Sequence, residues 1–189
     1  GPGDLERSTD NGATWAIVIA KDTPNTRGVQ SVTIGPDGTL WALYGSHTDT
    51  SASLIVYKSI DNGVTWNPAY TDGGSVLSAL LPVDIACHPT NPNIIAVTCI
   101  RNSGGPRLVI TTDAYATAPA IRTMGGSGAG TNGLWLTFAD PLFRPDRIVV
   151  AGPSGIIQTT DDNGLAWTTR DDPAPTTVGF LGRFGSRLL

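Results

Sequence analysis

Residues 59–66 read Ser59-Ile60-Asp61-Asn62-Gly63-Val64-Thr65-Trp66, and related octets stand at three further places in the chain. Near copies begin at Ser8 and Thr160, and a degenerate copy without the glycine and the tryptophan begins at Thr111. The four starting positions, 8, 59, 111 and 160, are spaced by 51, 52 and 49 residues. Self-similarity at such a period is typical of repeat architectures. The chain is therefore expected to contain four copies of one structural unit.

Each octet is expected to form a tight hairpin turn, because short apolar runs precede it and another short strand follows. The aspartate at its third position can accept backbone N–H groups within the turn, as in an Asx turn. The glycine supplies a residue with positive φ, and the tryptophan covers the turn. The copy at 111–118 lacks both, so its turn is predicted to be looser or reshaped.

The octet resembles the Asp-box, or BNR repeat, of sialidase-like and sortilin-like β-propellers, and the resemblance extends over essentially the whole chain. It implies an all-β fold, a β-propeller of four-stranded antiparallel blades with Asp-box hairpins. The residues that carry the motif are Asp10, Gly12, Trp15, Asp61, Gly63, Trp66, Asp113, Asp162, Gly164 and Trp167. These ten are expected to have structural roles.

The strands expected around the octets divide a single domain, 1–189, into three complete blades and one split blade. The blade repeats span about 24–72, 73–124 and 125–172, and the split blade combines 173–189 with 1–23. The strands predicted for the complete blades are 30–34, 40–44, 54–58 and 67–70, then 83–87, 94–100, 107–111 and 121–123, then 134–138, 147–151, 156–160 and 168–170.

The two ends of the chain resemble parts of one blade. Residues 187–189 followed by 1–10 read as a near copy of 147–160, so strands at 178–183 and 187–189 would begin a blade that a strand at 4–8 continues. Three arrangements remain open. One chain closes a ring with both ends, half-blades pair between neighbouring molecules, or the chain is a piece of a longer array.

Composition excludes several classes of function. The net charge of −4 argues against a nucleic-acid binder, which usually carries a basic stripe. No apolar run approaches the roughly 18 residues that span a bilayer, so membrane insertion is not expected. The polar surface with few lysines favours an extracellular location or a virion or cell surface.

Two cysteines, Cys87 and Cys99, exclude a disulfide scaffold and a zinc knuckle. They flank a turn at 88–93 and are expected on adjacent strands, either as two buried thiols or as a cross-strand disulfide. No metal and no cofactor are expected.

The resemblance implies that a ligand site would lie on the face opposite the Asp-boxes. Loops and strand ends on that face carry the candidate ligand-binding residues Arg27, His47, Asp49, Arg101, Trp135 and Arg170. An indole ring among cations and polar groups would suit a sugar or an anionic ligand.

A complete catalytic set is missing from the sequence. Sialidase chemistry requires a glutamate that activates a tyrosine, and the only glutamate is Glu6, on a strand that leads into an octet. An inverting glycanase needs two carboxylates about 6.5–9.5 Å apart. The candidates Asp22, Asp49, Asp72, Asp171 and Asp172 can equally be turn residues.

The sequence therefore predicts a non-catalytic propeller that is a binding module or a structural and assembly module. Its expected partner is another protein or a second copy joined through the terminal half-blades. A glycoside hydrolase or sialidase relative, and a glycan-binding, lectin-like propeller, stay open as alternatives.

Overall fold

The computed structural model describes residues 3–22, 27–46, 54–71, 80–101, 105–124, 134–139, 142–152, 157–170, 183–184 and 187–188. Every regular element in these ranges is a β-strand, and all paired strands are antiparallel. The first sheet contains β1 (Leu5–Arg7) and β2 (Ala16–Ile19). The last contains β15 (Arg183–Phe184) and β16 (Arg187–Leu188).

Three four-stranded sheets lie between these two hairpins, and each follows the order of the chain. The first consists of β3 (Arg27–Ile34), β4 (Leu40–Ser46), β5 (Ile55–Ser59) and β6 (Asn67–Thr71). The second consists of β7 (Leu80–Cys87), β8 (Ile95–Arg101), β9 (Gly105–Thr111) and β10 (Ala120–Thr123). The third consists of β11 (Trp135–Phe138), β12 (Ile148–Ala151), β13 (Ile157–Thr160) and β14 (Thr168–Arg170).

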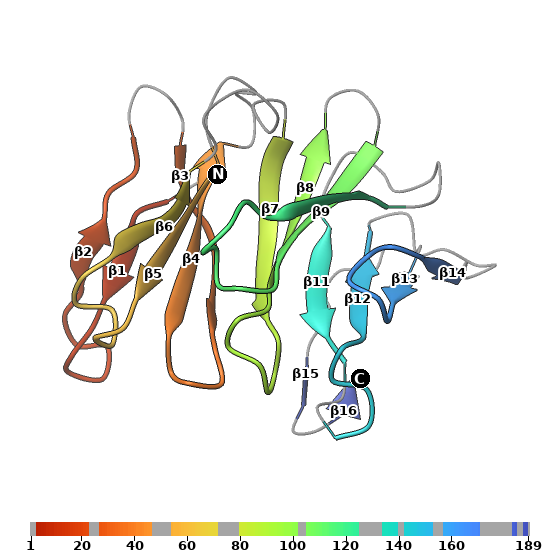
Figure 1. The fold of residues 1–189 in the computed structure, drawn as a ribbon. Coiled ribbons are helices and arrows are strands. Elements are labelled where there is room, and N and C mark those ends of the chain that lie inside the picture. The colour runs from red at the N-terminus through yellow and green to blue at the C-terminus, as the bar shows by residue number, and fades with distance from the viewer. Residues whose placement is uncertain are drawn as a thin grey trace.

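The twelve strands of these sheets match the predicted strands, with bounds that differ by at most three residues. We call the three sheets blades 1, 2 and 3, and we call β1–β2 the first half-blade. The sheets fan out side by side, with β1–β2 at one end of the row and blade 3 at the other, and β15–β16 lies below β11 and β12 (Figure 1). Each terminal hairpin pairs within itself, so the expected joining of both ends into one sheet is not seen.

The blades meet through their first strands, because β7 contacts both β3 and β11. Asp84 lies at a β-bulge of β7, and its carboxylate connects all three strands. Its Oδ1 accepts the Ser31 hydroxyl from β3 at 2.7 Å, and its Oδ2 accepts the Leu136 N–H from β11 at 3.0 Å. Oδ1 also accepts the Ile85 N–H at 2.9 Å. Burial raises the pKa of this carboxyl above its ordinary value.

Apolar side chains fill the spaces between adjacent blades. One cluster lies between blades 1 and 2 and includes Trp41, Leu43 and Val97. A second lies between blades 2 and 3 and includes Leu108 and Ile148. Second strands are buried on both faces in this arrangement, which explains the continuous apolar runs of β4, β8 and β12.

The two cysteines are not cross-strand partners. Cys87 lies opposite Ile95, and Cys99 lies opposite Pro82. The disulfide alternative was wrong. It required a turn centred near residue 93, which would place Cys87 opposite Cys99. The hydrogen bond from His88 N to Ile94 O centres the turn near residue 91 instead. Neither cysteine forms a disulfide, and burial raises the pKa of Cys87 to about 12.

Candidate functional site

The octet at 59–66 forms the expected hydrogen-bonded turn. Ser59 Oγ donates to Asp61 Oδ1 at 2.8 Å and accepts the Gly63 N–H at 2.9 Å. Asp61 accepts the backbone N–H of Thr65 at 2.9 Å and its hydroxyl at 2.6 Å. The Trp66 indole N–H donates to Gly63 O at 3.2 Å. Hydrogen bonds from Thr65 and Ser59 favour the charged carboxylate and lower the pKa of Asp61 to about 2.

The octets at 8–15 and 160–167 repeat the hydrogen bonds to the aspartate from the residues two before and four after it, around Asp10 and Asp162. In the octet at 160–167, Ala166 supplies only an N–H group, and the Trp167 indole N–H has no hydrogen-bond partner among the described residues. In each of the three, the glycine has a positive φ between 78° and 88°. The asparagine before it is also left-handed, with φ of 57–58°. Two successive left-handed residues define a type I′ turn, for which Asn-Gly is the preferred pair.

The degenerate octet keeps its turn, so the prediction of a looser or reshaped turn was wrong. Thr111 Oγ1 donates to Asp113 at 2.7 Å and accepts the Tyr115 N–H at 3.0 Å. Tyr115 takes the position of the glycine with φ 66°. Its ring stacks on Tyr70 at 5.4 Å and lies 6.0 Å from Trp41, between blades 1 and 2. This packing holds a bulky residue in a backbone conformation that normally favours glycine.

Four of the six candidate ligand residues lie at the sheet ends opposite the octets. Arg27 and Trp135 begin β3 and β11, and Arg101 and Arg170 end β8 and β14. The Arg27 guanidinium forms an ion pair with the Asp22 carboxylate.

The structure leaves the proposed ligand patch as a prediction. His47 and Asp49 fall outside the described residues, as do the side chains of Arg101 and Arg170. Trp135 is half-buried at the start of its strand.

His88 belongs to the turn between β7 and β8. Its Nδ1 accepts the N–H groups of Thr90 and Asn91 at 3.2 and 3.0 Å, and its Nε2 lies 3.1 Å from Asp146 Oδ1. Nδ1 therefore serves this turn, and Nε2 connects it to the turn between β11 and β12. Within the ranges that the structure describes, no three His, Cys, Asp or Glu side chains gather as a metal site would require.

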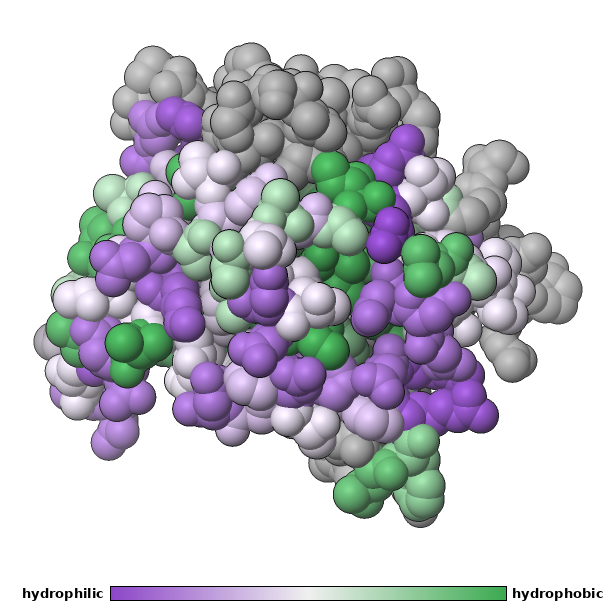
Figure 2. Space-filling view, viewed as in Figure 1, coloured by the Kyte–Doolittle hydropathy of each residue, from purple (hydrophilic) through white to green (hydrophobic). Residues whose placement is uncertain are grey.

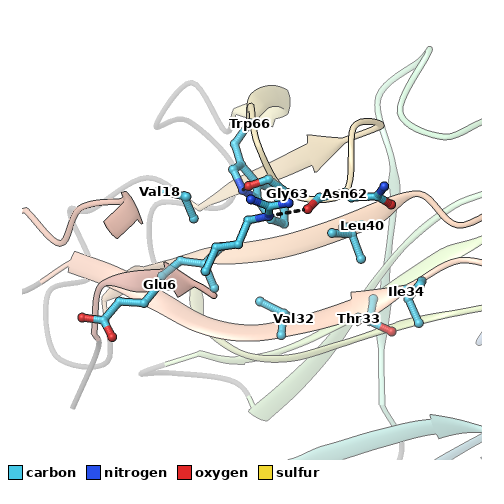
Figure 3. Close-up of a pocket in the computed structure, with 11 residues that line it drawn as sticks. Glu6, Val18, Val32, Thr33, Ile34, Leu40, Asn62, Gly63 and Trp66 are labelled. Atoms are coloured by element: carbon cyan, nitrogen blue, oxygen red, sulfur yellow. Dashed lines mark hydrogen bonds between the residues drawn. The ribbon is translucent and has the colours of Figure 1, made fainter. Parts of the chain in front are cut away.

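A mostly apolar groove of about 400 Å³ separates the first half-blade from blade 1 (Figure 3). We call it the half-blade groove; its lining is Leu5, Glu6, Arg7, Val18, Val32, Thr33, Ile34, Leu40, Asn62, Gly63 and Trp66. Val32 and Ile34 are 53% and 63% exposed although both are aliphatic. Arg7 reaches across one end and donates to Asn62 O at 2.7 Å. The Glu6 carboxylate points away from the apolar side chains (Figure 3).

The first half-blade has a second open side, at its own octet. In the two other octets with a glycine, that glycine faces a neighbouring sheet. A Cβ at Gly63 would lie 3.4 Å from Arg7 Cδ in the first half-blade. A Cβ at Gly164 would lie 2.9 Å from Leu108 Cδ2 in blade 2. A Cβ at Gly12 would meet only Trp15 of the same octet. Trp15 is 60% exposed. Hydrophobic side chains are visible at this edge of the molecule in Figure 2.

Sequence reasoning predicted that the ends would lack partners but did not identify this groove. Its aliphatic residues lie on β1–β4, which carry no unusual motif, and Asn62, Gly63 and Trp66 belong to an octet that was expected to form a turn. The signal that could have identified it is the alternation of polar and apolar residues in β3. Val32 and Ile34 are apolar and lie on the side of β3 that faces no complete blade.

Comparisons with known proteins agree with this architecture. No family model matches the chain. The capsid protein of Kennedya yellow mosaic virus (strain Jervis bay) is 32% identical over 104 residues, which is 55% of this chain and 48% of that protein. The matched part therefore corresponds to about half the length of that relative.

Two solved structures show the likeness in fold. The GH74 enzyme of Niastella koreensis superposes with a TM-score of 0.55 at 23% identity, over 95% of this chain and 23% of that one. YCF48 bound to D1 peptide superposes with a TM-score of 0.57 at 18% identity, over 87% of this chain and 46% of that one. The chain is all-β, and these likenesses support a β-propeller fold. In the described part of the chain, no helix has the length and hydropathy to cross a membrane.

Proposed function

We propose that the protein is a non-catalytic propeller that serves as a binding or structural and assembly module. The observation that carries this proposal is the half-blade groove, where aliphatic side chains lie exposed beside the unpaired edge of β1. Exposed strand edges next to apolar surface bind extended or hairpin segments of other chains by adding strands to a sheet. The surface is therefore suited to protein association.

The carboxylates support a non-catalytic function. A glycosidase requires two carboxyl groups that face one sugar. In the described residues, the octet aspartates bind their own turns, Asp84 joins the blades, and the carboxylates of Asp22 and Asp161 are paired with arginines. Glu6 borders the groove but points away from it.

Two of the similar proteins are consistent with association. YCF48 is described as bound to D1 peptide, and the sequence relative is a capsid protein. We include a virion or cell surface in the proposal as the location of this module.

Hydrolysis and assembly assays test the proposal together. The intact protein is incubated with β-glucans, arabinan and fluorogenic sialosides, and its mass is measured by light scattering after chromatography. The expected result is no turnover and a species larger than one chain. Turnover that Asp49→Asn or Asp171→Asn abolishes would overturn it. A glycan array distinguishes the lectin-like alternative, for which sugar binding would depend on Trp135.

A further inference from the structure

We propose that the half-blade groove accepts the β15–β16 hairpin of a second copy of this chain. The inference rests on the proposed assembly function and names the partner of that surface. The first half-blade is incomplete on two sides, and a single neighbour of this kind would complete both.

The missing element can be derived from the repeat. Strands β5, β9 and β13 each precede an octet, and each has a strand on both sides. β1 also precedes an octet, but its own residues pair only with β2. Just before it, Gly3 forms an antiparallel bridge with Val29 of β3, so the edge is open along Leu5–Arg7. The element that would complete it is an antiparallel pair equivalent to β3–β4, lying against Val32, Ile34 and Leu40.

The β15–β16 hairpin has the topology of such a pair. It follows the octet and last strand of blade 3, as β3–β4 follow those of the first half-blade and β7–β8 follow those of blade 1. No other described strand pairs with it. In its register Arg183 lies opposite Leu188 and Phe184 opposite Arg187, so each face of the hairpin carries one apolar residue and one arginine. The charge of the two arginines complements that of the anionic Glu6 at the groove rim.

A second copy fits better than the hairpin of the same chain. Three complete blades separate β15–β16 from β1–β2 along the chain, and β15–β16 lies below β11 and β12, away from β1–β2 (Figure 1). A neighbouring copy would bring its blade 3 along with its hairpin. That blade would cover Gly12 and Trp15 in the way that blade 2 covers Gly164. Repetition of this head-to-tail contact gives a closed ring or a filament.

A matched pair of variants tests the groove. Ile34→Asp places a carboxylate in the groove at a position that is 63% exposed, and Ile60→Asp makes the same change at a position outside it that is 79% exposed. Light scattering should give at least twice the mass of one chain for the native protein and for Ile60→Asp. Ile34→Asp should have the mass of one chain, with a circular dichroism spectrum unchanged from the control. A native protein of single-chain mass, or assembly that survives Ile34→Asp, would overturn the proposal.

Cross-linking identifies the donor of the hairpin. Two copies with tags of different length carry Val32→Cys and Leu188→Cys, respectively, and are joined with a short bismaleimide. The expected product contains both tags. A chain that carries both substitutions and cross-links within itself, as a species of single-chain mass, would contradict the second copy and assign the groove to its own hairpin.

The inference and the proposed function fail in different ways. A single-chain species that hydrolyses no glycan and binds another protein removes only the inference. An assembled species that hydrolyses a glycan removes the proposed function and leaves the inference standing.

Discussion

Each octet aspartate accepts hydrogen bonds from hydroxyl and N–H groups two residues before and four residues after it. The roles of Asp61 and Gly63 could be predicted from sequence because turn chemistry is local. The role of Tyr115 could not, because its left-handed backbone is held by rings from blade 1. A contact between residues distant in the sequence leaves no pattern in the octet itself.

Asp61→Asn should weaken the acid dependence of stability. The pKa of Asp61 is lowered to about 2 from an ordinary 3.8, so its contribution is present above 3.8 and lost as the pH falls toward 2. We expect the variant to have a lower Tm at neutral pH and a flatter fall of Tm between pH 4 and pH 2. Thermal unfolding followed by circular dichroism measures both. Thr65→Val removes one donor and should flatten the curve partly, whereas curves parallel to that of the native protein would refute the assignment.

Tyr115→Phe should stabilise the protein. The Tyr115 hydroxyl is buried without a hydrogen-bond partner, a situation that costs about 1–3 kcal/mol. The substitution keeps the stack on Tyr70 and the contact with Trp41. Urea denaturation should show a higher midpoint with an unchanged slope. Tyr70→Phe is the matched control and should give no such gain; a lower midpoint for Tyr115→Phe would count against this account.

At the scale of strands, element positions could be predicted better than their pairing. Turn residues such as Pro36 and Gly38 mark where β3 ends and β4 begins. Register depends on bulges, which occur at Val29/Ser31 in β3 and at Pro82/Asp84 in β7. The positions of Cys87 and Cys99 followed from this register, and the even alternation of the sequence gave no indication of the bulges.

Gly45→Ala should destabilise the contact between blades 1 and 2. A Cβ at this position would overlap Cγ of the Pro82 ring, so the β7 backbone or the proline ring must move. Overpacking of this kind costs about 1–3 kcal/mol. Gly152→Ala is the control, because its Cβ would lie 3.7 Å from Leu134, an ordinary contact. Equal urea midpoints for the two variants would show that the strand accommodates the extra methyl group.

At the scale of the whole molecule, the three four-stranded sheets and their order could be predicted because the octets recur evenly along the chain. The position of one end of the chain relative to the other could not be predicted, because it depends on the angle of rotation between each blade and the next. That rotation is set by side chains between blades, such as Leu43, Val97 and Ile148. The half-blade groove is a product of the same geometry.

Asp84→Asn should destabilise all three blades together. The Asn oxygen can replace Oδ1 for Ser31 and Ile85, but its NH₂ group would face the Leu136 N–H that Oδ2 now accepts. An unpaired buried donor costs about 1–3 kcal/mol. Urea unfolding followed at tryptophans of different blades should shift to one common lower midpoint. Separate transitions for the blades would contradict a shared junction.

The Asp84 junction also has a consequence for synthesis on the ribosome. Ser31 leaves the exit tunnel before Asp84, and Leu136 leaves it later, so the carboxylate gains its last partner only when the third blade has emerged. Until then, a nascent chain that has folded two blades lacks the partner of Oδ2, and the side of β7 that β11 will cover is open to water. Emergence of β11 therefore completes the junction, and slow translation before that point would extend the period in which the nascent chain is exposed to chaperones and proteases.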